Sequence, residues 1–350
     1  MAAPVPFNFT SSAATIAGDL YLPSGNGPFP TVITAPGFGG VKEMLIPDWC
    51  RAFASSGIAC MGFDYPGFGA SGDAPGGVRQ EVDPDQQVQS LTDGLDALVK
   101  DPRIDKNKLG MWGTSLSGGH TITITASDPR IKADVPIIPF ISAASEGIDI
   151  ETLAPVIAQD MAQRMMGRPG KTIPSAGPPG SVAVMNTDGA LDWMNAMAAN
   201  AKTFKNEVLV SSLLKMATYN TGPAAKKIKV PTFVITAKDD TITPSNSSHD
   251  ALEGVAGVEF KDFPGTHFGL FADEKAVNGE PGHYEEVIDL TVAHFKKHLL
   301  DGGLVTGGAA AGPNEPAEGG TELGGDSAPA NGSAPAPPCT KRNMRRGSRI

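Results

Sequence analysis

The chain has 350 residues, 40% of them hydrophobic, and a formal net charge of −10 at pH 7. This length suffices for one large α/β domain and does not by itself require two. The negative charge argues against nucleic acid as the main partner, and no apolar run is long enough to span a membrane.

The first residues of the chain and its cysteines indicate the cellular compartment in which we expect the protein. Residues 1–22 lack the basic and apolar regions of a secretory signal peptide. The three cysteines, Cys50, Cys60 and Cys339, are odd in number and no pair has CxxC spacing. We therefore expect neither a disulfide framework nor a zinc site, and we expect a cytoplasmic protein in a reducing environment.

Predicted strands and helices alternate along residues 1–300, which we expect to form one domain. The helices predicted at 86–100 and 284–300 carry apolar residues at a 3.6-residue period. Because the strands are almost continuously apolar, the alternation predicts an α/β fold with a mainly parallel sheet covered by helices on both faces. The main predicted strands are 31–35, 58–65, 108–113, 133–138, 231–237 and 258–263.

The alternation is interrupted in the middle of the chain. This part has helical pieces, a Gly/Pro-rich loop at 167–180 and many methionines. We interpret residues from about 141 to 229 as a helical cap inserted over the carboxyl edge of the sheet. Its flexible methionines and its tryptophan either line a pocket for an apolar substrate, with Met165 and Trp193 as candidates, or pack the cap onto the core.

The last fifty residues differ from the rest in composition. Residues 301–350 contain 17 Gly or Pro residues and no aromatic residue. Such a segment cannot bury enough apolar surface to offset its ordering entropy, so we predict a disordered tail. Its basic end, which contains Lys341 and Arg349, is more typical of a solvated terminus than of a localisation signal.

One serine lies at the junction of a predicted strand and a predicted helix. The run GTSLSGG, residues 113–119, follows a strand and precedes a helix at 121–126. The backbone must turn sharply there, which requires small neighbours. The turn places the hydroxyl at a helix N-terminus, where the negative charge that develops during acyl transfer is favoured. Ser115 is therefore the predicted nucleophile; a Gly/Ser-rich helix cap without catalysis is the alternative.

A serine nucleophile requires a base and a carboxylate that orients the base. His267 follows the last predicted strand of the sheet, and Asp239 and Asp240 follow the strand before it. Carboxyl ends of parallel strands share one edge of a sheet, so these side chains can reach the serine. We predict His267 as the base and Asp240 as the orienting acid, with Asp239 as its alternative. His120 is the rival base, but its helical position points it away from the serine.

Acyl transfer also requires backbone N–H donors for an oxyanion. One donor is expected from Leu116, directly after the nucleophile, and the other from Phe38 in the loop PGFGG at 36–40. The glycines of this loop let the backbone approach a substrate closely; a glycine-rich turn without this role is the alternative. The loop lacks the G-x-x-x-x-G-K-[ST] pattern of phosphate-cradling loops.

Together these segments resemble the α/β-hydrolase superfamily over about residues 7–300. The runs PGFGG, DYPGFGASG, GTSLSGG, KDDTITP and GTH follow the order of that superfamily. The runs PGFGGVKEM at 36–44 and EVDP at 81–84 are similar to a branch of dienelactone-hydrolase-like and X-Pro-dipeptidyl-peptidase-like proteins, which includes fungal polyketide-transferase-like members. The resemblance implies an eight-stranded, mostly parallel sheet, no metal and no cofactor. Ser117 departs from the G-x-S-x-G pattern, which has glycine at this position.

The sequence therefore predicts a serine hydrolase that cleaves an ester, thioester or amide bond of a small-molecule substrate through an acyl-enzyme. Carboxylic esters are preferred because the predicted cap is apolar. An acyltransferase or polyketide-tailoring enzyme, in which an alcohol replaces water, is the alternative. A catalytically silent hydrolase-fold binding protein is the third possibility, and the intact Ser, Asp and His residues argue against it.

Overall fold

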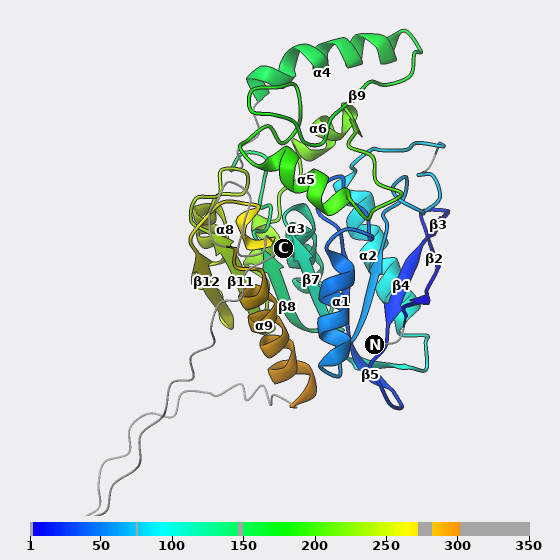
Figure 1. Ribbon diagram of the computed structural model, residues 1–350, viewed down its shortest axis with the longest axis vertical. Helices are drawn as coiled ribbons and strands as arrows, with labels where there is room; N and C mark the ends of the chain where they lie inside the picture. The colour runs from blue at the N-terminus through cyan, green and yellow to red at the C-terminus, as the bar shows by residue number, and fades with distance from the viewer. Residues whose placement is uncertain (1–2, 75, 146–149, 272–281, 302–350) are drawn as a thin grey trace, which may run out of the picture. The chain divides into compact units, whose positions relative to one another are not determined.

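The computed structural model describes residues 3–74, 76–145, 150–271 and 282–301. These residues belong to one compact unit, residues 1–304, and a separate unit comprises residues 305–350. Apart from Asp301, the predicted disordered tail lies outside the described residues. Figure 1 labels most helices and strands of the first unit.

Eight strands form one mostly parallel sheet (Figure 1). Their order from edge to edge is β1, β4, β6, β5, β7, β8, β11 and β12. All pairs from β6 to β12 are parallel, whereas β4 runs antiparallel to both of its neighbours, so the predicted mainly parallel sheet is confirmed. The strands are β1 Val5–Pro6, β4 Gly18–Tyr21, β5 Phe29–Ala35, β6 Ala59–Phe63, β7 Ile104–Thr114, β8 Ile131–Ile137, β11 Thr232–Ala237 and β12 Val258–Phe263, with a separate hairpin of β2 Phe9–Ser11 and β3 Ala14–Ile16.

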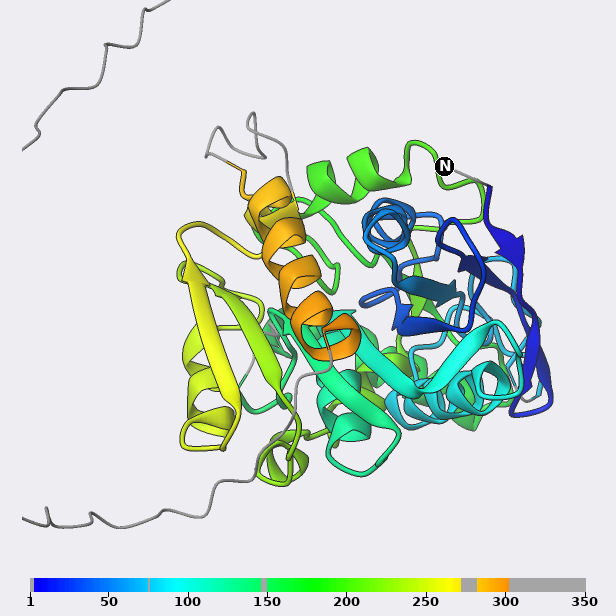
Figure 2. The same ribbon diagram turned by 90° about the horizontal axis from the view of Figure 1, so that it is seen from below.

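Helices cover both faces of this sheet, as predicted. Figure 2 shows α1 (blue) and α9 (orange) on one face and α2 (cyan), α3 (teal) and α8 (yellow-green) on the other. Within the described ranges, no helix combines the length and the apolar composition that a membrane span requires. The helices of the two layers are α1 Ile46–Ser55, α2 Pro84–Leu98, α3 Leu116–Thr125, α8 Ser245–Leu252 and α9 Tyr284–Phe295, which continues as a π-helical turn at Lys296–Leu300.

The burial pattern of the chain explains this double cover. All five residues of β6 are buried, so this strand has no solvent-facing side. On α2, the periodic residues Leu91, Leu95 and Leu98 are each 0% exposed and face the sheet. Complete burial of a leucine side chain stabilises the fold by about 1.5–3 kcal/mol. The apolar periodicity seen in the sequence therefore corresponds to the packed face of this helix.

The segment between β8 and β11 lies above the carboxyl edge of the sheet (Figure 1). Polar contacts join it to the rest of the unit. The Glu43 carboxylate accepts two hydrogen bonds from Thr203, one from its N–H at 2.9 Å and one from the threonine hydroxyl at 2.8 Å. Lys215 Nζ donates to Glu81 at 2.8 Å and to Asp83 at 2.5 Å. Its elements are α4 Ile150–Met165, β9 Thr172–Ile173, α5 Ala190–Ala198, β10 Val208–Leu209, α6 Ser211–Met216 and α7 Gly222–Ala225.

The prediction that the cysteines form no disulfide is wrong. Cys50 of α1 and Cys60 of β6 are disulfide-bonded, with their Cα atoms 5.1 Å apart. Helix α1 packs directly on β6, so a separation of ten residues brings the two sulfur atoms together although neither an even count nor a CxxC motif signals it. The inference of a reducing compartment depended on the absence of disulfides and loses that basis.

Asp134 is a buried carboxylic acid in the middle of β8. It is 0% exposed, neither of its carboxyl oxygens has a hydrogen-bond partner among the described residues, and burial raises the pKa of its carboxyl group to about 8. Between pH 3.8 and about pH 8, the folded protein therefore holds a proton that the unfolded chain has released. Stability contributed by this group is complete at acidic pH and falls as the pH rises through that window.

We predict that Asp134→Asn removes this part of the pH dependence of stability. As the pH rises, the free energy of unfolding should decrease faster in the wild-type protein than in the variant. The two slopes should differ by up to about 1.4 kcal/mol per pH unit, because asparagine does not titrate. Urea denaturation at several pH values inside the window measures both slopes, with Asp239→Asn, at an exposed aspartate, as the control. Equal slopes in the wild type and Asp134→Asn contradict the prediction.

Candidate active site

The sharp turn predicted at Ser115 is present. Strand β7 ends at Thr114 and α3 begins at Leu116, so one residue connects the two elements. Ser115 has φ 54° and ψ −122°, a backbone conformation that residues with a Cβ atom rarely adopt. Its N–H donates to the Ile137 carbonyl and its carbonyl accepts from the Phe140 N–H, both at 2.9 Å. These two hydrogen bonds hold the strained backbone in place.

Close backbone contacts explain the glycines around this turn. A Cβ atom on Gly113 would lie 2.4 Å from the Ser117 carbonyl oxygen and 2.8 Å from Thr121 Cγ2. A Cβ atom on Gly37 would lie 3.3 Å from the Thr114 carbonyl oxygen. The loop at 36–40 therefore lies directly beside the turn that carries the serine.

Asp240 and His267 form a buried pair at the same edge of the sheet. They follow the neighbouring strands β11 and β12. Asp240 Oδ2 lies 2.8 Å from His267 Nδ1, and each residue is 5% exposed. A carboxylate can only accept, so Nδ1 carries the proton and Nε2 remains as the basic nitrogen. Asp239, the alternative acid, is exposed and accepts instead from the Gly265 N–H at 3.1 Å.

Thr243 belongs to this site but was not predicted. Its hydroxyl lies 2.9 Å from Asp240 Oδ2 and 3.1 Å from His267 Nδ1. The other carboxylate oxygen, Asp240 Oδ1, accepts from the Ile242 and Thr243 N–H groups at 2.8 Å each. An aspartate that accepts from the backbone two and three residues later forms an Asx-type turn, and the run DDTIT is its signal in the sequence. The turn fixes the carboxylate before any substrate arrives.

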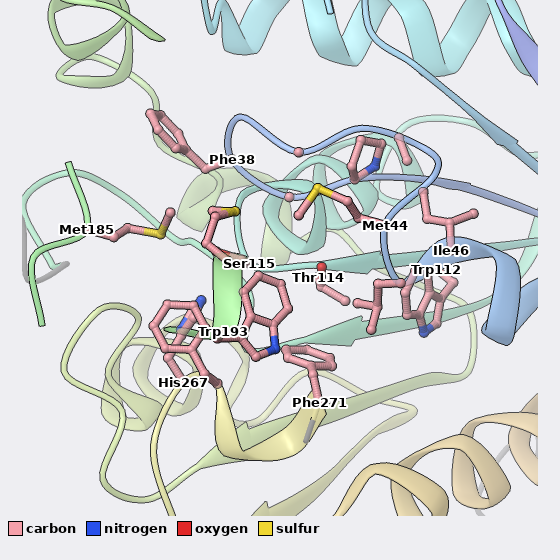
Figure 3. A pocket seen from close by; sticks show the side chains of 17 residues that line it. Phe38, Met44, Ile46, Trp112, Thr114, Ser115, Met185, Trp193, His267 and Phe271 are labelled. Carbon is pink, nitrogen blue, oxygen red and sulfur yellow. The ribbon is translucent and has the colours of Figure 1, made fainter. Parts of the chain in front are cut away.

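Ser115 and His267 line one pocket (Figure 3). Its walls come from the 36–40 loop, from the beginning of α1 and from the segment above the sheet. They are almost entirely apolar. Among the described residues no hydrogen bond joins Ser115 to His267, as is common in free enzymes, where such contacts tighten only when substrate binds. The lining side chains labelled in Figure 3 include Phe38, Met44, Ile46, Trp112, Met185, Trp193 and Phe271.

The structure separates the two cap residues that were candidates for substrate contact. Trp193 of α5 lines the pocket, and its ring centroid is 5.1 Å from that of Phe268, the neighbour of His267. Met165, at the end of α4, is 87% exposed and does not line the pocket. Met185 and Met194 are the methionines of this segment that line the pocket. Met165 is too distant, because α4 lies farther from the sheet than α5 does (Figure 1).

Two backbone N–H groups beside the serine are available to bind an oxygen. Phe38 lies in the 36–40 loop, and Leu116 is the first residue of α3. Within the described residues, neither N–H donates to a backbone carbonyl or a side chain. Buried N–H groups are almost always paired, so two unpaired ones on the segments next to Ser115 are a suitable place for an oxyanion.

His120, the rival base, has a different environment. It is fully buried on α3, where its Nδ1 lies 2.7 Å from the Tyr219 hydroxyl and its Nε2 lies 2.9 Å from Gln87 Oε1. Burial lowers the pKa of His120 to about 3, so the ring is neutral. Both ring nitrogens are occupied by these partners, which leaves no nitrogen for Ser115.

One family model matches most of the chain. Residues 28–275 match the family model Hydrolase_4, described as serine aminopeptidase, S33. The chain belongs to this α/β-hydrolase family. The matched range contains Ser115, Asp240 and His267, and the eight-stranded, mostly parallel sheet is the fold that membership implies.

Individual relatives are distant in sequence. The quorum-quenching protein AidA of Acinetobacter baumannii is 26% identical over 277 residues, which cover 78% of this chain and 90% of that protein. The thiohydrolase aneE of Aspergillus aculeatus is 31% identical over 199 residues, or 57% of this chain and 60% of that protein. The crystal structure of the α/β-hydrolase GrgF from Penicillium sp. superposes with a TM-score of 0.70 at 24% identity, over 85% of this chain and 99% of that chain.

In the described part of the chain, no group of three or more His, Cys, Asp or Glu side chains is arranged to hold a metal ion. The apolar pocket likewise presents no cluster of charged groups suited to a phosphate-bearing cofactor.

We predict that Ser115→Gly is more stable than Ser115→Ala by about 1 kcal/mol or more, because glycine adopts a positive φ without strain and alanine does not. Both variants lack the hydroxyl, so the comparison isolates the backbone. The free energy of unfolding from urea denaturation measures the difference. Equal stability of the two variants, or a more stable alanine variant, contradicts the strain at this turn.

Proposed function

We propose that this α/β-hydrolase cleaves an ester-type bond of a small-molecule substrate with Ser115 as nucleophile, His267 as base and Asp240 as the acid that orients the histidine. One observation carries the proposal: a buried Asp240–His267 hydrogen bond of 2.8 Å leaves Nε2 as the basic nitrogen in the pocket that Ser115 also lines. Nucleophile, base and orienting group are thereby within one site.

The proposed reaction has two steps. First, His267 Nε2 takes the Ser115 proton while the serine oxygen bonds to the substrate carbonyl carbon, and the resulting oxyanion accepts from the Phe38 and Leu116 N–H groups. The intermediate then expels the leaving group, which takes the proton from His267. Second, His267 removes a proton from water while the water oxygen attacks the carbonyl carbon of the acyl-enzyme. The bond to Ser115 then breaks, the serine oxygen takes back the proton from His267, and the acid leaves.

The pocket favours an apolar substrate. A second apolar hollow shares Phe38 and Met185 with the first and is also lined by Leu116, Phe140 and Met216. Apolar walls on more than one side of the serine accommodate apolar groups near the reacting carbonyl and exclude water from it. We therefore propose carboxylic esters and thioesters with apolar acyl groups as the substrate class. The similarity to aneE, a thiohydrolase, supports the thioester as a candidate.

Acyl transfer to an alcohol is the second candidate. It uses the same residues, and a polyketide transferase from Penicillium sp. is 25% identical over 245 residues. The apolar hollows also favour an organic acceptor over water. Product analysis with and without added alcohol separates hydrolysis from transfer, because a transferase forms the new ester whereas a hydrolase forms the acid.

We predict that Ser115→Ala lowers kcat on aryl esters by roughly 10³- to 10⁶-fold while the protein remains folded, because the covalent step requires the hydroxyl. A fluorophosphonate probe should label Ser115 in the folded wild-type protein and label nothing in the variant. Full turnover by Ser115→Ala refutes the nucleophile. Absence of labelling in folded wild-type protein favours a silent binding protein instead.

The neighbouring aspartates provide a matched pair of variants. Asp240→Asn should lower kcat on the order of 10⁴-fold, since an amide in place of the carboxylate favours the wrong imidazole tautomer. Asp239→Asn changes the same chemical group at an exposed position and should leave kcat within about twofold. Steady-state kinetics of both variants on one aryl ester show which aspartate orients the histidine. A larger loss of kcat in Asp239→Asn than in Asp240→Asn reverses the assignment of the acid.

A further inference from the structure

Ser117, which stands where the family motif has glycine, makes specific hydrogen bonds. It is 1% exposed in the first turn of α3. Its Oγ donates to the Pro36 carbonyl and lies 2.9 Å from the hydroxyl oxygen of Tyr65. This one side chain therefore joins three segments that are far apart in the sequence: the nucleophile turn, the 36–40 loop and the loop after β6.

The direction of these hydrogen bonds follows from the protons available. A carbonyl oxygen only accepts, so Ser117 uses its single proton for Pro36. The hydroxyl of Tyr65 must then be the donor to Ser117. Burial raises the pKa of Tyr65 above its usual value, so the tyrosine keeps the proton that it donates. The result is a directed chain from Tyr65 through Ser117 to Pro36.

The residue next to Tyr65 holds the other end of the same loop. Asp64 Oδ1 accepts from the Lys42 N–H at 2.6 Å, and Oδ2 accepts from the Ala70 N–H at 2.9 Å. Two consecutive residues after β6 thus hold the chain from 36 to 42 at both ends. Asp64 acts directly, and Tyr65 acts through Ser117.

Phe38 lies between the two fixed ends. The Gly37 carbonyl accepts from the Gly40 N–H at 3.1 Å, which closes a tight turn. The N–H of Phe38 shares a peptide unit with that carbonyl, and in a trans peptide the two groups point in opposite directions. The Phe38 N–H therefore points out of the turn, and its direction is set by the orientation of the Pro36–Gly37 segment that Ser117 holds.

We propose that Ser117 and Tyr65 are positioning residues that hold the Phe38 N–H where it binds the oxyanion. The inference rests on the proposed function, because it assigns a role within that reaction. Neither side chain touches the reacting atoms. Since the oxyanion exists only in the transition state and the tetrahedral intermediate, loss of this hydrogen-bonded chain should slow the chemical step without weakening substrate binding.

The test compares Ser117→Ala and Ser117→Gly, the second of which restores the family's motif. In both variants, kcat on an aryl ester and the rate constant for fluorophosphonate labelling of Ser115 should fall by ~10- to 100-fold, with KM within about twofold. The affinity for a trifluoromethyl ketone, which forms an oxyanion on binding, should fall by the same factor. Tyr65→Phe should show a smaller loss in the same direction, because Ser117 still donates to Pro36.

Ser90→Ala is the matched control. Ser90 is equally buried and its hydroxyl also contacts another hydroxyl, that of Ser11 at 2.9 Å, and a backbone carbonyl, that of Gln86 at 2.8 Å. It should leave kcat and inhibitor affinity unchanged. Wild-type kcat and inhibitor affinity in folded Ser117 variants overturn the inference, and so does an equal loss in Ser90→Ala.

Two further outcomes are distinguishable. If Ser117→Ala does not fold, Ser117→Gly and Tyr65→Phe make the same comparison, and wild-type kinetics in both overturn the inference. Failure of the proposed function has a different signature, because in that case Ser115 of the wild-type protein is not labelled at all.

Discussion

The positive-φ backbone conformation of Ser115 is the constraint on which the rest of the site depends. A single residue connects β7 to α3, and its φ of 54° carries the strain of that connection. Gly113 is needed because a side chain there would meet the backbone of Ser117. The turn raises the serine above the sheet and places the first N–H of α3 beside it. Everything else in the site is arranged around this fixed point.

The two strands beyond β8 supply the second half of the site. Asp240 and His267 follow the adjacent strands β11 and β12, so the parallel order of the sheet brings them together although 27 residues separate them. The turn that starts at Asp240 already provides hydrogen bonds to both carboxylate oxygens, in addition to the one from the histidine. Burial of this pair under apolar residues such as Trp193 and Phe268 lowers the local dielectric constant, which strengthens its electrostatic interaction.

The segment above the sheet is held to the body by charged contacts, not by its apolar side chains alone. Glu43, Glu81 and Asp83 all bind residues of this segment, and all three belong to the runs PGFGGVKEM and EVDP that resemble one branch of the superfamily. These runs are thus explained by how the cover of the pocket is attached. The attachment through Glu43, Glu81 and Asp83 adds to the role proposed for Phe38, which lies in the first of these runs.

Much of the fold was predictable, because local signals set it. Apolar strands between amphipathic helices fix a parallel sheet, and side chains that follow such strands must gather at one edge. The features that the sequence did not reveal depend on contacts between distant segments. The Cys50–Cys60 bond arises from the packing of α1 on β6, the exposure of Met165 from the distance of α4 to the sheet, and the role of Ser117 from partners at positions 36 and 65. No periodicity or motif encodes these pairings.

A covalent acyl group on Ser115 is the most direct test of the proposed chemistry. Wild-type protein is mixed with an aryl ester, quenched in acid within the first turnovers, digested and examined by mass spectrometry. We predict that the peptide containing Ser115 gains the mass of the acyl group and loses it on further incubation in water. Turnover of the ester with no adduct on this peptide, or a transient adduct on a different residue, contradicts the proposed chemistry.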